Sequence, residues 1–508
     1  MHVTVRIFFA LSILLLAACQ GVQLREDELP LEPSYARPAA NEGPLADLAG
    51  HFTGRLGPEH SGFRLLDSSY DGLAWRLALI DSAVSSVDIQ TYLWYPDHSG
   101  RLLLQRAIDA ALRGVHVRLV VDDLLTIGQD QLIYELDRFP NVEVRLFNPW
   151  GNRSVLSRGG EMVAEFERLN TRMHDKLLIA DGRAAVVGGR NIGDHYFGLS
   201  EDYNFHDLDV LGFGHIATQS NEMFDHFWNS SWVVSAGNLY LEPDPGYVQE
   251  AWPRLVETNA AAPELASFGA QRRDWSQELD AVRDELHPGT SVLLFDTTTD
   301  DEIEQNVAGE MFNFMGQAQN ELLITNAYII PGQGGIDFVR KLTDRGVRVR
   351  ILTNSLASHD VPAVNSHYKD WRDDFIGAGA ELYEFRPDAA VRDLIEVPPV
   401  KGEFVGLHTK AFVLDGRKSF IGSMNFDPRS FAINTEAGAF IDSPGLAADL
   451  ARVMERDMLP ENAWQVFLDD EGKPYWVNSD ETVYKQPARD GMQRVMDKIF
   501  KIFPKEQY

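Results

Sequence analysis

Cysteine is almost absent from this chain, since Cys19 is the only one among 508 residues. No intrachain disulfide can form, so the fold must be held by hydrophobic cores. A chain of this length with 44% hydrophobic residues can build two of them. The cysteine and the histidines also show no metal-ligand spacing. We therefore expect two domains, no metal and no other cofactor.

Positive charge is scarce as well. The chain has 46 Lys and Arg against 76 Asp and Glu, which gives a formal net charge of −30 and a pI near 4.8. Such a surface repels phosphate backbones, so the composition argues against a nucleic-acid partner and against a nuclease. Net charge does not describe a single cleft, and a local basic pocket is compatible with it.

A hydrophobic run long enough to span a membrane is also missing. Residues 7–16 are apolar except for Ser12, and this stretch is too short for a comfortable span. Small residues then precede Cys19, a pattern that resembles the bacterial lipoprotein signal, whose cysteine is lipidated. We expect a signal peptide over 1–18 and a tether over 19–60, which is rich in Pro, Glu, Asp and Gly. The alternatives are an uncleaved anchor and an ordinary signal that is cut elsewhere.

What the chain does contain is a histidine–lysine–aspartate pattern that occurs twice, 234 positions apart. Both copies read H-x-K-x-x-x-x-D and continue to G-[GS]-x-N with identical spacing. The first copy consists of His174, Lys176, Asp181 and Asn191, and the second of His408, Lys410, Asp415, Ser423 and Asn425. Residues 113–118 are echoed by 345–350, and 87–94 by 322–330, at nearly the same offset. Blocks that repeat at one offset indicate a duplicated domain.

The duplication predicts an α/β fold in which each half is a mixed β-sheet flanked by helices. Strand-like runs such as 87–93 and 142–147 recur in the second half, and apolar spacing predicts a helix over 100–112. We divide the body into a first repeat (61–256), a helical connector (257–288), a second repeat (289–460) and a C-terminal extension (461–508).

The extension ends in a basic amphipathic stretch over 490–508. One interpretation is a packed terminal helix whose lysines face solvent. The other is an interfacial helix that meets anionic lipid.

In both motif copies the histidine and the lysine are two residues apart, so on an extended strand they point to one face. Folding the halves together would bring two histidines, two lysines and two asparagines to one cleft. Lysine and amide donors suit a phosphodiester anion, and two histidines supply a nucleophile and an acid or base near neutral pH. The sequence therefore predicts one shared site for phosphodiester chemistry.

These paired motifs resemble those of the phospholipase D superfamily over essentially the whole body of the chain. The resemblance implies two phospholipase D-like repeats that share one active site at their interface. It implies that His174 is the nucleophile, which forms a phosphohistidine, and that His408 is the general acid and then the base. The residues that would bind the phosphoryl oxygens are Lys176, Lys410, Asn191, Asn425 and Ser423.

The same resemblance assigns a carboxylate downstream of each asparagine to orient the histidine of the opposite half. Glu436 is the candidate in the second half. Asp207 is the candidate in the first half, with Asp209 close behind it. Asp181 and Asp415 would be structural rather than catalytic.

Three stretches, 168–170, 188–194 and 354–364, are most similar to the C-type bacterial cardiolipin synthases. That branch implies transfer of a phosphatidyl group onto phosphatidylglycerol, with membrane phospholipids such as phosphatidylglycerol and phosphatidylethanolamine as partners. The main alternative is a phospholipase D that hydrolyses phospholipids to phosphatidic acid, and a further one is a non-catalytic envelope lipoprotein. Nothing in the sequence identifies an accessory protein. Gln20, which follows the lipidation cysteine Cys19, favours the periplasmic face of the outer membrane.

Overall fold

A computed structural model describes residues 31–501, apart from 127, 154 and 301. The expected signal peptide, Cys19 and tether residues 19–30 lie outside the described residues, and so do residues 502–508. The described part of the expected tether contains helix α2 (Pro44–Leu56), which packs on strand β1 (His60–Leu66), so these residues belong to the folded body.

The first half is a mixed sheet with helices on its faces. Strands β2, β3 and β4 are parallel, β5, β6 and β8 form an antiparallel meander beside β2, and β9 pairs with β4. The strand bounds are β2 (Ser86–Thr91), β3 (His116–Asp122), β4 (Val142–Phe147), β5 (Leu177–Ala180), β6 (Ala184–Gly188), β8 (Asp209–Gly214) and β9 (Val233–Ser235). The helices are α3 (Ser69–Ser82), α4 (His98–Leu112), α5 (Asp130–Asp137), α6 (Val155–Ala164), α7 (Phe166–Asn170), α8 (His215–Trp228), α9 (Tyr247–Ala261) and α10 (Ser276–Glu285).

The helix expected over 100–112 is α4, and its ends have clear local causes. The Asp97 carboxylate accepts the N–H of Gly100 at 3.1 Å, which caps the first turn. Gly114, just past the last turn, has φ of 93°, a left-handed conformation that favours glycine.

The second half repeats the plan of the first. Its strands are β10 (His287–Phe295), β13 (Glu321–Asn326), β14 (Arg348–Asn354), β15 (Glu381–Phe385), β17 (Lys410–Leu414), β18 (Lys418–Gly422), β19 (Ala437–Asp442), β20 (Ala463–Leu468), β21 (Pro474–Val477) and β22 (Thr482–Val483). Its helices are α11 (Val307–Met315), α12 (Gly332–Asp344), α13 (Pro362–Tyr368), α14 (Arg372–Gly377), α15 (Arg392–Ile395), α16 (Pro428–Ala432), α17 (Pro444–Asp457) and α18 (Gly491–Phe500).

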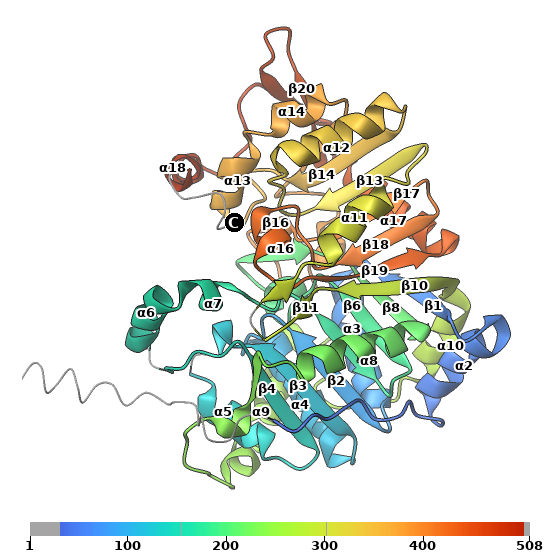
Figure 1. Cartoon of the computed structure of the whole chain (residues 1–508), viewed down its shortest axis with the longest axis vertical. Coiled ribbons are helices and arrows are strands. Elements are labelled where there is room, and N and C mark those ends of the chain that lie inside the picture. The colour runs from blue at the N-terminus through green and yellow to red at the C-terminus, as the bar shows by residue number, and fades with distance from the viewer. Residues whose placement is uncertain (1–30, 127, 154, 301, 502–508) are drawn as a thin grey trace, which may run out of the picture.

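The two sheets are joined into one. In space the strand order of the first half is β9-β4-β3-β2-β5-β6-β8-β1. The order of the second half, written in the matching direction, is β20-β15-β14-β13-β17-β18-β19-β10, so these strands correspond one to one. β1 pairs antiparallel with β10, which makes an 18-stranded sheet continuous through the middle of the molecule (Figure 1). The α/β fold of two repeated halves is thus confirmed. The sequence did not predict that the two sheets form one.

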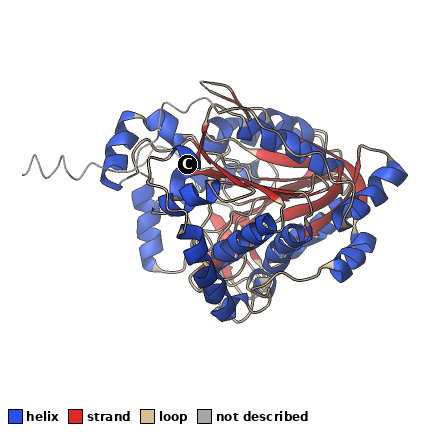
Figure 2. Ribbon diagram, turned by 90° about the horizontal axis from the view of Figure 1, so that it is seen from below, coloured by secondary structure: helices blue, strands red, loops and turns tan. Residues whose placement is uncertain are grey.

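Helices cover both faces of this sheet (Figure 2), and the cores on the two faces differ. On one face each half has a core of its own, built around α3 and α4 in the first half and around α11 and α12 in the second. On the other face α8 and α17 bury side chains in a single core that both halves share. Phe224 and Phe227 of α8 and Leu450 of α17 belong to it. This shared core and the β1–β10 pair fix the halves against each other.

The motif aspartates lie at the hairpins that follow the motif strands. Asp181 and Asp415 have φ of 57° and 50°, a left-handed conformation that aspartate tolerates better than most residues. The Asp181 carboxylate accepts the backbone N–H groups of residues 84–86, and that of Asp415 accepts those of residues 319–321. Each aspartate therefore ties its hairpin to the start of β2 or β13.

Helix α18 has the expected amphipathic pattern, but it packs with its polar side inward. Gln493 and Asp497 are buried against α13 and its neighbours, whereas Met492, Val495 and Ile499 are 66%, 50% and 46% exposed. The structure thus shows a packed terminal helix with Lys498 exposed, while its apolar side chains also face outward. Across the described part of the chain, we find no helix with the length and apolar character needed to traverse a bilayer.

We expect Asp181→Ala to lower the free energy of unfolding by about 1–3 kcal/mol, because three backbone N–H groups lose their acceptor. Asp181→Asn keeps an acceptor oxygen and tolerates the left-handed backbone, so it should cost less. Asp415→Ala should also cost less, since Asp415 is exposed and water can replace its carboxylate. Urea denaturation measures all three, and an Asp181→Ala protein as stable as wild type would contradict this role.

Candidate active site

Two short backbone pairings across the halves place the motif histidines. Strand β7 (Tyr203–His206) of the first half pairs parallel with β16 (Phe404–Leu407) of the second, so the next residues, Asp207 and His408, come together. A second parallel bridge joins Met173 to Thr435. The residues that follow it are His174 and Glu436. In both pairings the backbone register therefore sets a histidine beside a carboxylate of the opposite half.

The side chains complete these pairs. His174 Nδ1 lies 3.0 Å from both carboxylate oxygens of Glu436, and His408 Nδ1 lies 2.6 Å from Asp207 Oδ2. Both carboxylates are fully buried, and both histidines line one cleft. A carboxylate at Nδ1 fixes the ring and leaves Nε2 for a ligand. Asp209, the other candidate in the first half, instead binds Arg76 and Arg190 at 2.8 and 2.9 Å.

The motif lysines are buried behind the histidines. Each ammonium donates to the backbone carbonyl of its own histidine. Lys176 also lies 5.3 Å from the ring centre of Tyr92, and Lys410 lies 6.0 Å from that of Tyr328. Burial lowers the pKa of Lys176 to about 7 and that of Lys410 to about 8. Both ammonium groups are therefore close to losing their charge near neutral pH.

The two histidine–carboxylate pairs differ in their electrostatics. Burial, together with the Lys176 and Lys410 charges, holds the pKa of His174 well below its ordinary value. Burial also lowers the pKa of His408 to about 4, with Lys410 adding to the effect and Asp207 opposing it. Burial raises the pKa of Glu436 well above its ordinary value. Burial alone would raise the pKa of Asp207 as well, but the charges of His408 and Lys410 outweigh it and lower that pKa.

The motif asparagines line the cleft, but the motif serine does not contact it in the expected way. Asn191 donates to the Tyr196 hydroxyl at 2.8 Å, and the Oδ1 of Asn425 is buried without a hydrogen-bond partner. The Ser423 hydroxyl, expected at the phosphoryl oxygens, donates to Glu436 at 2.5 Å. Ser423 thus contacts the carboxylate that holds His174, and its expected contact with the phosphoryl oxygens stays a prediction.

The cleft has a volume of about 340 Å³, and aromatic rings form much of its wall. These rings are Tyr92, Tyr95, Tyr196, Tyr203, Phe205 and Tyr328. Our sequence analysis missed them all. Tyr92 and Tyr328 could have been found, because each follows an equivalent strand, β2 or β13, and each stands beside the motif lysine of its half.

Comparison with known proteins gives consistent matches. The family model described as "Cardiolipin synthase, PLD-like domain" matches residues 77–228 and 311–458. The chain is 34% identical to cardiolipin synthase C of Escherichia coli (strain K12), over 88% of this chain and 96% of that protein. It is 23% identical to cardiolipin synthase B of the same strain, over 76% of this chain and 80% of that protein. The crystal structure of a phosphatidylserine synthase from Haemophilus influenzae Rd KW20 matches with a TM-score of 0.56 at 13% identity, covering 87% of this chain and 93% of that one, which supports the fold.

The lowered lysine pKa values predict how anion binding changes with pH. Sulfate keeps one charge state between pH 6 and 9, so it reports the protein groups alone. We expect its affinity to fall about tenfold or more over this range, because Lys176 and Lys410 lose charge above pKa values of about 7 and 8. Titration calorimetry measures this, and Lys176→Met with Lys410→Met is the control that should abolish the dependence. Constant affinity in the wild type would show that the lysines do not titrate there.

Proposed function

The chain belongs to the family of phospholipase D-like cardiolipin synthase domains, and from this premise we propose that it is a phosphatidyltransferase that makes cardiolipin. The acceptor is the free glycerol of phosphatidylglycerol, and the donor is a second membrane phospholipid. One observation carries the proposal. Two histidines, each held at Nδ1 by a buried carboxylate of the opposite half, face a single cleft backed by two buried lysines.

In the first step of the proposed reaction, His174 Nε2 attacks the donor phosphorus and the bond from phosphorus to the leaving oxygen breaks. His408, as an imidazolium, gives its proton to that oxygen. In the second step, neutral His408 takes a proton from the glycerol hydroxyl of phosphatidylglycerol. The alkoxide oxygen attacks the phosphohistidine, which releases cardiolipin and free His174. Lys176 and Lys410 balance the charge on the phosphoryl oxygens in both steps.

The different surroundings of the two histidines support this division of roles. A nucleophilic imidazole must be neutral, and the pKa of His174 lies well below its ordinary value. A proton carrier needs a partner for its charged form, and Asp207, with its lowered pKa, is that partner for His408. Burial is the main cause of the low pKa of His408 and the lysine charges add to it, so a phosphodiester anion in the cleft, which offsets those charges, raises this pKa.

The wall of the cleft favours an alcohol acceptor over water. Hydrolysis would use the same catalytic groups, so the outcome depends on what reaches the phosphohistidine. Tyr196 and Phe205 lie 5.1 and 4.9 Å from the His408 ring, and Tyr92 lies 5.2 Å from the His174 ring. These rings flank both histidines, which leaves less room for water beside the phosphohistidine.

Exposed apolar side chains around the cleft support a lipid surface as the place of reaction. The outward face of α18, formed by Met492, Val495 and Ile499, is interspersed with Arg494 and Lys498. Helix α18 packs on α13, and Val361 and Val364, at the start of α13, line the cleft.

Two further apolar side chains are exposed to solvent: Val163 of helix α6 is 84% exposed, and Phe166 at the start of α7 is 42% exposed. Both α6 and α18 project at the left of Figure 1, on the two sides of the boundary between the halves. Apolar side chains with basic neighbours suit an anionic bilayer. We further propose that Cys19 carries lipid and holds the protein at the periplasmic face of the outer membrane, which only the sequence supports.

The reaction is tested by following lipids with mass spectrometry on vesicles of phosphatidylglycerol and phosphatidylethanolamine. The wild type should form cardiolipin, and released ethanolamine or glycerol identifies the donor. His174→Ala should form none, and His408→Ala should lose roughly 10²–10⁴-fold in rate. The matched control is His287→Ala, because His287 also pairs with a carboxylate, Asp449, at 2.7 Å, but outside the cleft. Phosphatidic acid without cardiolipin would mean a hydrolase and refute the transfer reaction.

The lipid-facing role of α18 is tested in a Cys19→Ser background, so that no acyl anchor masks it. We expect Met492→Ser with Val495→Ser to weaken co-sedimentation with phosphatidylglycerol vesicles about tenfold, since less apolar surface enters the bilayer. Leu112→Ser with Leu459→Ser is the control, because these leucines are 62% and 45% exposed on other surfaces. Equal binding of both double variants would exclude α18 from the membrane contact.

A further inference from the structure

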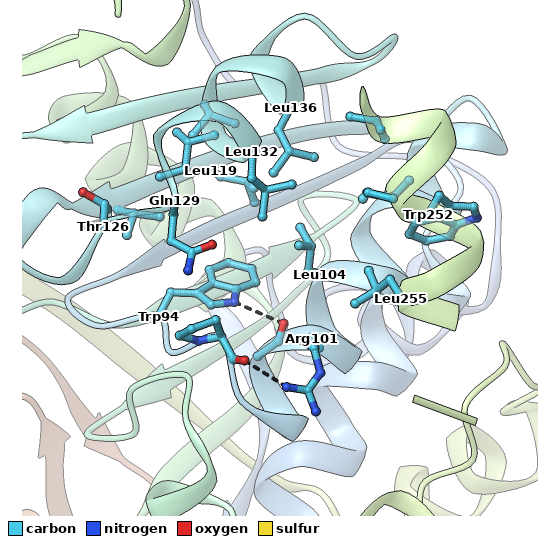
Figure 3. Close-up of a pocket in the computed structure, with 18 of the residues that line it drawn as sticks. Trp94, Arg101, Leu104, Leu119, Thr126, Gln129, Leu132, Leu136, Trp252 and Leu255 are labelled. Carbon is cyan, nitrogen blue, oxygen red and sulfur yellow. Dashed lines mark hydrogen bonds between the residues drawn. The ribbon is translucent and has the colours of Figure 1, made fainter. Parts of the chain in front are cut away.

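A second cavity, of about 360 Å³, lies in the first half between the sheet and helices α4, α5 and α9 (Figure 3). We call it the α9 groove. Side chains of β3 and β4 form its floor, and its walls are mainly leucine, isoleucine, valine and tryptophan. Protein cores pack densely, and an apolar cavity of roughly 150 Å³ already binds small apolar ligands. The α9 groove is larger than that, and its lining predicts an apolar occupant.

The groove is not closed by its own helices. Of the fifteen residues of α9, only Val248 and Asn259 are buried. Leu104, Trp252 and Leu255 face the groove from α4 and α9 and stay only half-buried (Figure 3). Apolar side chains left partly in water over such a concave area indicate a binding surface.

The charges at the groove are unlike those of the rest of the molecule. The chain has 76 acidic and 46 basic residues, yet Arg101 and Arg254 are the only charged residues among the described residues that line the groove. Arg254 is exposed and Arg101 is half-buried, so both lie where the groove meets solvent. One Arg101 nitrogen donates to the Pro96 carbonyl at 2.9 Å, while its Nε has no hydrogen-bond partner. An apolar groove with guanidinium groups at its mouth suits an anionic amphiphile.

The groove shares a wall with the active-site cleft. After β2 the chain continues in an extended segment, in which Tyr92, Leu93 and Tyr95 line the cleft and Trp94 lines the groove. Trp94 is fixed there by its indole N–H, which donates to the Gly100 carbonyl at 3.1 Å, and by a bridge to Ile192, the residue after Asn191. One strand-like segment thus separates the phosphoryl site from the apolar groove.

From these observations we propose that the α9 groove binds an acyl chain of the phospholipid substrate while its phosphodiester lies at His174 and His408. This rests on the proposed function, because it takes the substrate to be a phospholipid. An acyl chain spans about half of the roughly 30 Å hydrocarbon core of a bilayer, so it can pass one segment of chain and still fill the groove. The guanidinium groups at the mouth take the ester carbonyl oxygens of the lipid, while its phosphate lies in the cleft.

The test uses the full-length His174→Ala protein, which binds substrate without turning it over. The probe is phosphatidylglycerol with a diazirine at the end of one acyl chain, in vesicles with phosphatidylethanolamine. After irradiation, we expect labelled peptides from α4 and α9. Ala251→Trp fills the groove from α9 and should reduce this label about tenfold. Ala260→Trp, on the exposed side of the same helix, is the matched control and should leave it unchanged.

A kinetic measurement with an intact catalytic histidine accompanies the labelling. Ala251→Trp should raise the KM for dioleoyl phosphatidylglycerol about tenfold, or about 1.4 kcal/mol, and leave that for dihexanoyl phosphatidylglycerol unchanged. Label found only outside the groove, with no effect of Ala251→Trp, would overturn the proposal even if cardiolipin forms. Label in the groove of a protein that forms no cardiolipin would keep the lipid site and refute the proposed reaction.

Discussion

The pairing of each cleft histidine with a carboxylate of the opposite half is the constraint on which the rest of the structure depends. His174, Glu436, His408 and Asp207 are all buried, and an unpaired ionisable group costs several kcal/mol in such a place. Neither half can satisfy its own histidine, so neither can build the site alone. The continuous sheet through β1 and β10 and the core shared by α8 and α17 hold the halves in the one register that pairs all four groups.

The duplication has kept the geometry of the two pairs and changed their chemistry. A β-carbon at Gly189 would lie 2.4 Å from the Asp207 carboxylate, so the first copy has no room for a side chain there. The second copy has Ser423 at that position, and its hydroxyl, with that of Ser430, binds the longer Glu436. Both carboxylates thus contact a histidine, and Glu436 is held by two hydroxyl groups as well. Burial raises the pKa of Glu436 although Lys176, Ser423 and Ser430 oppose it, whereas His408 and Lys410 outweigh burial at Asp207, so the two pKa directions differ.

Most of what could be predicted came from the repeated motif. The features that it did not predict have physical reasons. Spacing identified the α/β halves, and the resemblance named the residues that the structure gathers at the cleft. It could not predict the joined sheet, because β1 and β10 are outside the motif and their pairing depends on how the halves meet. Periodicity predicted α18 but not its direction, since an amphipathic pattern is the same whichever side faces the protein. The contact of the Ser423 hydroxyl with Glu436 depends on where the Glu436 side chain lies, which the sequence pattern does not give.

A protein with a net charge of −30 would be expected to avoid an anionic bilayer. Charge repulsion is screened beyond about 8 Å at physiological ionic strength, however, so the side chains nearest the lipid decide the contact. Those on the outer face of α18 are apolar and basic, and the charged side chains among the described residues that line the α9 groove are two arginines. In the proposed membrane contact these apolar and basic side chains meet the lipid first, and the net negative charge of the rest of the chain favours that orientation.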